Sequence, residues 1–201
     1  MYKYLKIVDI RGREVLDSRG NPTVEAQVTV KADGKAGELF TAASTGKFEA
    51  MELRDGDKRY NGAGVSQAVE NINKEIYPAL EGMNGLNQRK IDSTMIAIDG
   101  TENKKKLGAN AILAVSMANM KACAKALKLP EYQYIGGICG EKMPIPMMNI
   151  LNGGAHASNN IDVQEFMILP VGAQSVKEGI RWCAEVYTCL KKLLKKDNLS
   201  V

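Results

Sequence analysis

Three places in the sequence combine residue types that could do chemistry. His156, the single histidine, closes a Gly-Gly-Ala-His sequence directly after an apolar run. Gln164 and Glu165 begin a second apolar run, and a carboxylate that enters a buried strand needs either a structural partner or a function. Ala43 and Ser44 belong to an Ala-Ser-Thr-Gly sequence after a predicted strand, and a hydroxyl with a backbone carbonyl suits a hard cation that prefers oxygen ligands.

Each of these places also has a structural interpretation, and the residues alone leave both open. A lone histidine can be a structural or solvated side chain even in a glycine-rich loop. The small residues around Ser44 are also typical of a mobile turn. The four cysteines lack the CxxC spacing of zinc sites, and we interpret them as reduced, mostly buried thiols.

Composition indicates ordinary globular material. The chain has 201 residues, of which 45% are hydrophobic and 25% charged, with a formal net charge of +4. No apolar run approaches the ~20 residues of a membrane-spanning helix, and the first ten residues are too short and charged for a signal peptide. We therefore expect a cytoplasmic protein. A lysine cluster near residues 191–196 closes a predicted helix, where cations complement the helix dipole, so nucleic-acid binding is a weak alternative.

The first two thirds of the chain read as a small α+β domain. Period-two alternation and a turn at Asp33-Gly34 predict a three-stranded antiparallel meander, and 3.6-residue periodicity then predicts helices. Pro78 and Gly82 are expected to end the first helix. We interpret residues 52–58 as a helix end and a charged turn. The strands are predicted at residues 6–10, 24–30 and 36–41, and the helices from residue 66, within 86–98 and within 108–127.

The pattern changes after residue 136. Residues 146–151 and 163–169 are short, continuously apolar runs typical of strands buried on both faces, and a long amphipathic helix follows them. Two strands and one helix can neither close a barrel nor cover both faces of a sheet, so this part is predicted to be an incomplete piece of an α/β sheet or barrel. The boundary is expected near residues 131–142, giving domains at 1–135 and 136–201.

Four sequences, in order along the chain, resemble those of enolase, which dehydrates 2-phosphoglycerate. They are Asp-Ser-Arg-Gly-Asn-Pro-Thr at 17–23, Glu-Leu-Arg-Asp-Gly-Asp-Lys at 52–58, Asn-Ile-Leu-Asn-Gly-Gly-Ala-His at 149–156 and Gln-Glu-Phe-Met-Ile at 164–168. The resemblance runs from about Tyr4 to Val201. It implies a small α+β N-terminal domain followed by the opening of an α/β (TIM-like) barrel that is truncated at Val201. It also implies a Mg²⁺-dependent glycolytic lyase, active as a dimer or higher oligomer.

The resemblance also implies roles for single residues. Ser44 would bind the second magnesium ion and Ala43 would lie at the substrate, while Gln164 would contact substrate. The implied catalytic residues are Glu165, near the departing hydroxyl, and His156, near the substrate phosphate. Arg13 and Glu25 match residues that form ion pairs with the barrel of the partner subunit.

The main departure from the family lies directly before Ala43. Where Pro-Ser-Gly is usual, the chain has Phe-Thr-Ala at 40–42, and alanine in place of a positive-φ glycine costs about 1 kcal/mol or more. The family's lysine base, its general-acid glutamate and its three metal-binding carboxylates are expected beyond Val201. We therefore expect the 201 residues alone to be inactive, with a non-catalytic fragment that binds or regulates a partner as the alternative.

Overall fold

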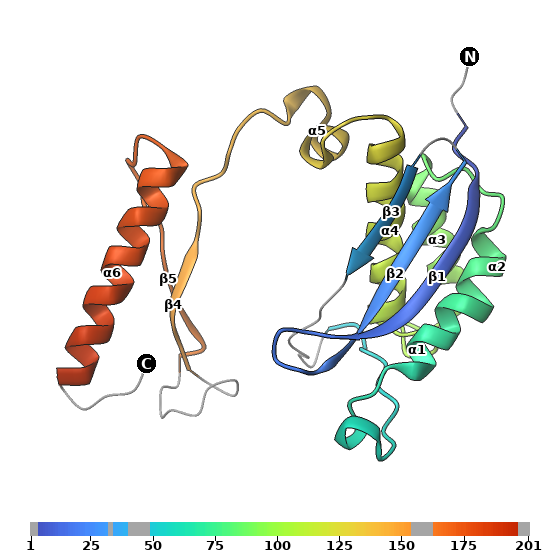
Figure 1. Ribbon diagram of the computed structural model, residues 1–201, viewed down its shortest axis with the longest axis horizontal. Helices are drawn as coiled ribbons and strands as arrows, with labels where there is room; N and C mark the ends of the chain where they lie inside the picture. Colours follow the sequence, from blue (N-terminus) through green and yellow to red (C-terminus); the bar gives the residue numbers. More distant parts are fainter. Residues whose placement is uncertain (1–3, 32–33, 40–48, 154–162, 197–201) are drawn as a thin grey trace. The chain divides into compact units, whose positions relative to one another are not determined.

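The computed structural model describes residues 4–31, 34–39, 49–153 and 163–196, which form two compact units, Met1–Gly140 (unit 1) and Glu141–Val201 (unit 2) (Figure 1). The end of the third predicted strand and the Phe-Thr-Ala departure at 40–42 lie outside the described residues. The candidate site residues Ala43, Ser44 and His156 lie outside them as well.

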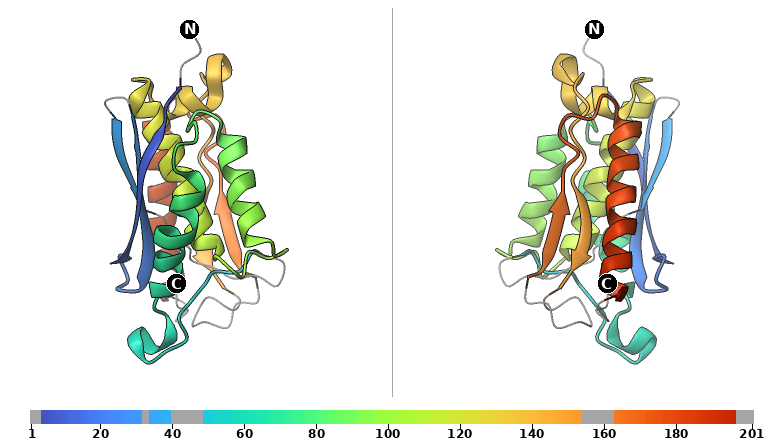
Figure 2. Two further views of the ribbon diagram at one scale, coloured as in Figure 1. Left: turned by 90° about the vertical axis from the view of Figure 1, so that its right-hand side faces the viewer. Right: turned by 90° about the vertical axis from the view of Figure 1, so that its left-hand side faces the viewer.

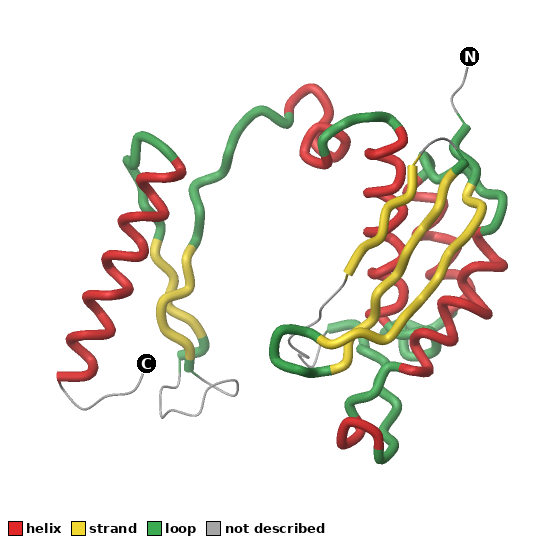
Figure 3. Tube along the Cα trace, viewed as in Figure 1, coloured by secondary structure: helices red, strands yellow, loops and turns green. Residues whose placement is uncertain are grey.

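Unit 1 contains an antiparallel sheet of β1 (Ile7–Leu16), β2 (Pro22–Val30) and β3 (Gly34–Leu39), in that order (Figure 3). β1 continues to Leu16 instead of ending at residue 10, because it pairs with β2 up to the contact of Leu16 with Pro22. Arg11 and Arg13 of this strand are exposed, whereas Glu14 accepts a hydrogen bond from the Val65 amide at 3.0 Å. The alternate residues of β2 that face the helices are buried: Val24, Ala26, Val28 and Val30.

The helix predicted from residue 66 passes through Pro78. It consists of α1 (Ser66–Asn71), a π-helical turn η2 (Ile72–Ile76) and α2 (Tyr77–Leu80), so the predicted stop at Pro78 was wrong. Proline has no N–H to give to the carbonyl four residues earlier and its ring crowds that carbonyl. The wider π turn relieves this crowding, because the Tyr77 N–H bonds to the Ile72 carbonyl, five residues back.

The other helices of unit 1 are α3 (Gln88–Asp99), α4 (Ala109–Ala126) and the short α5 (Glu131–Gly136), which is followed by the 3₁₀ turn η3 (Gly137–Cys139). α3 and α4 confirm the predicted helices. The Asn87 side chain accepts a hydrogen bond from the Lys90 amide at the start of α3, and Gly100 (φ 67°) ends that helix in the left-handed conformation. The helices cover one face of the sheet, and α4 contacts β2 and β3 (Figure 2).

The interpretation of residues 52–58 as a helix end was wrong, because no helix precedes them in the described stretch that begins at residue 49. They form an extended stretch and a bend that lead into the 3₁₀ turn η1 (Arg59–Gly62). The role of this segment is to cap α1: Asp55 Oδ2 accepts a hydrogen bond from the Ser66 amide (2.8 Å) and Oδ1 accepts one from the Gln67 amide (2.9 Å). Burial works to raise the pKa of Asp55, but these hydrogen bonds outweigh it and lower the pKa below its ordinary value.

Unit 2 is built from β4 (Met148–Asn152), β5 (Glu165–Ile168) and α6 (Val176–Lys196). β4 and β5 pair antiparallel. The prediction that both runs are buried on both faces was wrong for this unit, because one helix covers only part of a two-stranded sheet. Large apolar side chains of the strands and of their flanks are exposed: Met143, Ile145, Met147, Val163, Phe166, Met167, Leu169 and Val171.

Candidate functional site

Gln164 and Glu165 lie where the start of β5 meets the end of β4. In the antiparallel register, Glu165 pairs with Asn152, the last residue of β4. The Gly153 amide donates a hydrogen bond to the Gln164 carbonyl at 2.9 Å. Both ends of the segment that carries His156 therefore leave the same edge of this strand pair, beside Gln164 and Glu165.

This geometry resolves a conflict between the sequence pattern and the usual position of barrel active sites. Such sites lie at the carboxyl ends of strands, whereas Glu165 begins its own strand. Since β5 runs antiparallel to β4, the amino end of β5 lies at the carboxyl end of β4. Glu165 thus shares an edge with the loop that follows β4, as a barrel site requires.

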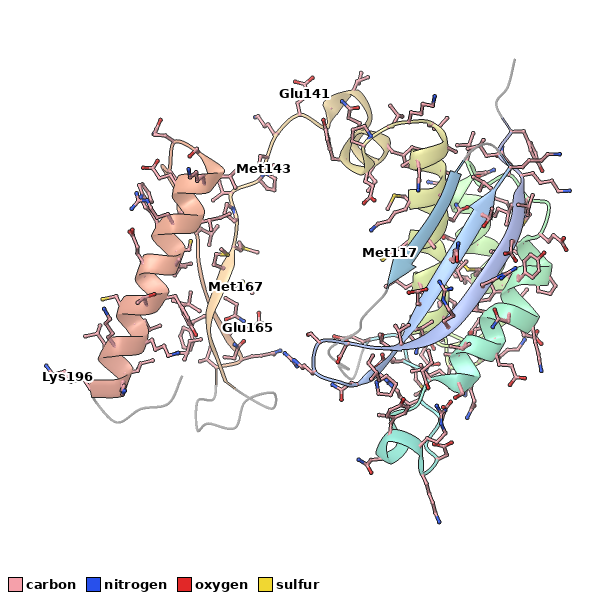
Figure 4. The ribbon with its side chains drawn as sticks, in the orientation of Figure 1. Met117, Glu141, Met143, Glu165, Met167 and Lys196 are labelled. Atoms are coloured by element: carbon pink, nitrogen blue, oxygen red, sulfur yellow. The ribbon has the colours of Figure 1, made fainter. Side chains whose placement is uncertain are left out.

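Glu165 and Gln164 are both exposed, and Figure 4 labels Glu165 on this strand pair. The prediction that the Glu165 carboxylate enters a buried strand was wrong for this unit. The two strands and one helix of unit 2 leave its side chain exposed to solvent. An exposed carboxylate and an exposed amide at the same edge can both reach a ligand. The Asn149 Nδ2 atom donates to Asn152 Oδ1 at 2.5 Å, which adds a further amide pair to this edge.

Sequence reasoning missed Asn110, a buried asparagine that holds the chain a few residues after the candidate residues Ala43 and Ser44. Residues 40–48, with Ala43 and Ser44, precede a described stretch in which the Leu53 amide donates to Asn110 Oδ1 (3.2 Å) and Asn110 Nδ2 donates to the Leu53 carbonyl (3.1 Å). Asn110 is only 2% exposed, at the start of α4. An asparagine beside the apolar start of a helix was the available signal, since a buried amide needs partners.

Arg13 and Glu25 face each other across β1 and β2. Arg13 Nε donates to Glu25 Oε1 at 2.7 Å, Arg13 Nη2 also contacts that oxygen, and Arg13 Nη2 reaches Gln27 Oε1 at 3.4 Å. The Arg13 side chain is 54% exposed and that of Glu25 is 23% exposed. The two residues implied to pair with a partner subunit therefore pair with each other in this chain.

The described residues do not assemble a magnesium site by themselves. No group of three or more His, Cys, Asp or Glu side chains within 4–31, 49–153 and 163–196 could hold a metal ion. Glu165 provides one carboxylate, while Mg²⁺ in proteins is usually held by one or two carboxylates together with water and substrate oxygens. Within the same described ranges, no helix is both long and apolar enough to cross a lipid bilayer.

Two family models match the chain, in the order of its two units. The enolase N-terminal domain matches residues 7–135, and the enolase C-terminal TIM barrel domain matches residues 141–200. Enolases as a family are lyases. Since the first match alone covers more than half of the chain, and since the antiparallel β4–β5 pair lies in the part matched by the barrel domain, the chain belongs to the enolase family.

Proposed function

We propose that these residues form part of an enolase that catalyses the reversible, Mg²⁺-dependent dehydration of 2-phosphoglycerate to phosphoenolpyruvate in glycolysis. The observation that carries the proposal is the register that pairs Glu165 with Asn152. It brings a solvent-accessible carboxylate and the Gln164 amide to the base of the segment with His156. A carboxylate at such an edge can exchange a proton with a departing hydroxyl.

The residue roles follow the family match. Glu165 assists the departing hydroxyl and its water, and His156 donates a hydrogen bond or a positive charge to the substrate phosphate. Gln164 and Ala43 contact substrate. Ser44 would supply an oxygen ligand to the cofactor Mg²⁺, and the charge of that ion would stabilise negative charge on the substrate carboxylate.

The 201 residues alone are proposed to be inactive. This proposal rests on the resemblance to the family, by which the lysine base, the general-acid glutamate and the three metal-binding carboxylates are expected outside these residues. Loss of a positioned base alone typically costs 10²–10⁴-fold in rate. The residues act in the cytoplasm, as domains 1–135 and 136–201, within a dimer or higher oligomer whose subunit contact includes Arg13 and Glu25.

The alternative function is binding. Unit 2 exposes many large apolar side chains, and exposed apolar patches favour protein contacts. As a fragment, the chain would then associate with a complete enolase and regulate it. Size-exclusion chromatography of the chain mixed with a full-length enolase tests this: absence of co-elution, with unchanged activity of the full-length enzyme, rejects the binding function.

The test of the main proposal combines an intact-mass measurement with an assay of phosphoenolpyruvate formation from 2-phosphoglycerate. A chain of 21.9 kDa is expected to give no turnover with or without Mg²⁺. A longer chain with the same first 201 residues is expected to turn over, and EDTA should abolish its activity. A folded longer chain that makes no phosphoenolpyruvate in saturating Mg²⁺ would overturn the proposal.

A further inference from the structure

The free edge of β1 carries a side-chain contact that neither the family nor the proposed activity accounts for. β1 is an outer strand of its sheet, so part of its main chain points away from β2. The Gly12 amide donates to Asn73 Oδ1 at 2.8 Å, and Asn73 Nδ2 donates to the Gly12 carbonyl at 3.3 Å. One amide side chain thus makes both hydrogen bonds that a residue of a neighbouring strand would make.

Two features of the sequence make this contact possible. Gly12 has no side chain, and a Cβ atom placed there would lie 3.0 Å from Ile72 Cβ, so only glycine lets the helix come this close. Asn73 belongs to the π-helical turn η2, between the buried residues Ile72 and Ile76. Those two residues pack into the core, while Asn73 lies at the exposed border of the sheet.

Near the start of β1, the same edge is closed by other groups. The Ile7 amide donates to the Met83 carbonyl and the Gly82 amide donates to the Ile7 carbonyl, each at 2.9 Å. The Tyr77 hydroxyl donates to the Val8 carbonyl at 3.2 Å. At Gly12, by contrast, both the amide and the carbonyl are held by one exposed side chain, that of Asn73.

Asparagine at position 73 is a poor choice for helix stability alone, because it has a lower helix propensity than alanine or lysine at an exposed position. An unpaired strand edge, on the other hand, is a template on which another chain can add a strand. We propose that Asn73 closes β1 to strand addition, and that the strand it excludes is β1 of a second copy of this chain. Two identical edges can pair antiparallel about a twofold axis, with each Gly12 near that axis.

The experiment compares Asn73→Ala with the matched control Asn71→Ala. Asn71 lies on the same helix, and its Nδ2 atom donates to the carbonyls of Lys106 (3.1 Å) and Leu107 (3.0 Å), which are not part of the sheet. Both variants lose two side-chain hydrogen bonds, but only Asn73→Ala opens a strand edge. Any association through unit 2 is common to both variants and to the parent chain.

The measurements are amide hydrogen exchange at Gly12 and sedimentation velocity over a range of protein concentrations. At low concentration, Asn73→Ala should speed exchange at Gly12 by about tenfold, while Asn71→Ala leaves it unchanged. At high concentration, Asn73→Ala should form more dimer than the control, and protection of Gly12 should return. If Asn73→Ala does not fold, Asn73→Ser, whose shorter side chain cannot make both hydrogen bonds to Gly12, is compared in the same way. Equal association of the position-73 variant and the control at every concentration, or unchanged exchange at Gly12, would overturn the proposal.

Discussion

The Gly153 amide and the Gln164 carbonyl are joined by a hydrogen bond of 2.9 Å, so the ten residues between them leave and re-enter the β4–β5 pair at the same point. Glu165 follows directly and pairs with Asn152. A change at Glu165 therefore acts at the base of this segment without removing a packing contact from a core, because the side chain is exposed.

Glu165→Gln is expected to lower kcat for 2-phosphoglycerate by about 10²- to 10⁴-fold in an enolase chain that continues past Val201, because the variant cannot exchange a proton. The KM should change much less, since the amide keeps its shape and hydrogen-bonding capacity. Steady-state kinetics measure both quantities. Glu185→Gln on α6, which loses only an exposed ion pair with Arg181, is the control and should leave kcat unchanged. A kcat within twofold of the parent value for Glu165→Gln would remove this residue from the mechanism.

The ion pair between Arg13 and Glu25 is expected to contribute little to folding. Both groups meet solvent, and exposed cross-strand pairs contribute about 0.2–1 kcal/mol. A double-mutant cycle of Arg13→Ala and Glu25→Ala, followed by urea denaturation, measures the coupling, which should also decrease in high salt. A coupling energy well above 1 kcal/mol would contradict this prediction, because the ion pair would then contribute substantially to the stability of the fold.

Asp99 is expected to make folding sensitive to acid. This carboxylate is only 3% exposed; burial works to raise its pKa, but hydrogen bonds from the Thr101 hydroxyl and the Leu107 and Thr101 amides outweigh it and lower the pKa. Because the pKa is lower in the folded state than its ordinary value of 3.8, the stabilisation is present above that value and is lost as the pH falls through it towards the folded-state pKa.

Asp99→Asn should therefore reduce the free energy of unfolding near neutral pH and flatten its dependence on pH in the acid range. Thermal melts between about pH 6 and pH 2.5 measure both effects. Glu102→Gln, an exposed change in the same loop, controls for the loss of one charge. An acid slope in Asp99→Asn as steep as that of the parent would assign the acid sensitivity to other groups.

The cysteines are expected to differ strongly in reactivity. All four are free thiols, but only Cys123 and Cys183 are buried, so the expectation of mostly buried thiols holds for half of them. Burial raises the pKa of Cys123 to about 11, against a weaker opposite effect of a hydrogen bond with Tyr134. The thiolate is the reactive form, so Cys123 should be alkylated by iodoacetamide at pH 8 at least about 100-fold more slowly than the exposed Cys139. Peptide mapping by mass spectrometry measures the rates, with the unfolded protein as the control; similar rates for the two thiols in the folded protein would contradict burial of Cys123.

Sequence patterns located the elements whose burial repeats regularly. α4 follows a 3.6-residue apolar period and β2 alternates, because each buries one face or stripe. α6 has the same helical period, but Val176, Ile180 and Leu193 on its apolar side are exposed. The strand that begins at Glu165 was predicted from a different signal, a short and continuously apolar run at residues 163–169. Its direction relative to β4 was not, since an apolar run has no polarity that would distinguish parallel from antiparallel pairing.

The sequence did not reveal hydrogen bonds between residues that are far apart in the chain. Asn73 and Asn110 look like ordinary polar residues of helices, and their roles appear only when Gly12 and Leu53 are brought beside them. Pro78 was taken as a helix stop because local rules do not include a π-helical turn that accommodates it. The positions of His156 and Ser44, which lie outside the described residues, remain predictions.

The hydrophobic cluster formed by the described residues lies wholly in unit 1, between Leu5 and Cys123. During synthesis this stretch leaves the ribosome first, and domains generally fold as units in that order. Unit 1 can therefore complete its core while the residues after Gly140 are still being added. A nascent chain that is arrested after unit 1 has left the ribosome should therefore already contain a protease-resistant domain. The apolar strands β4 and β5 would then leave the ribosome only after unit 1 has folded.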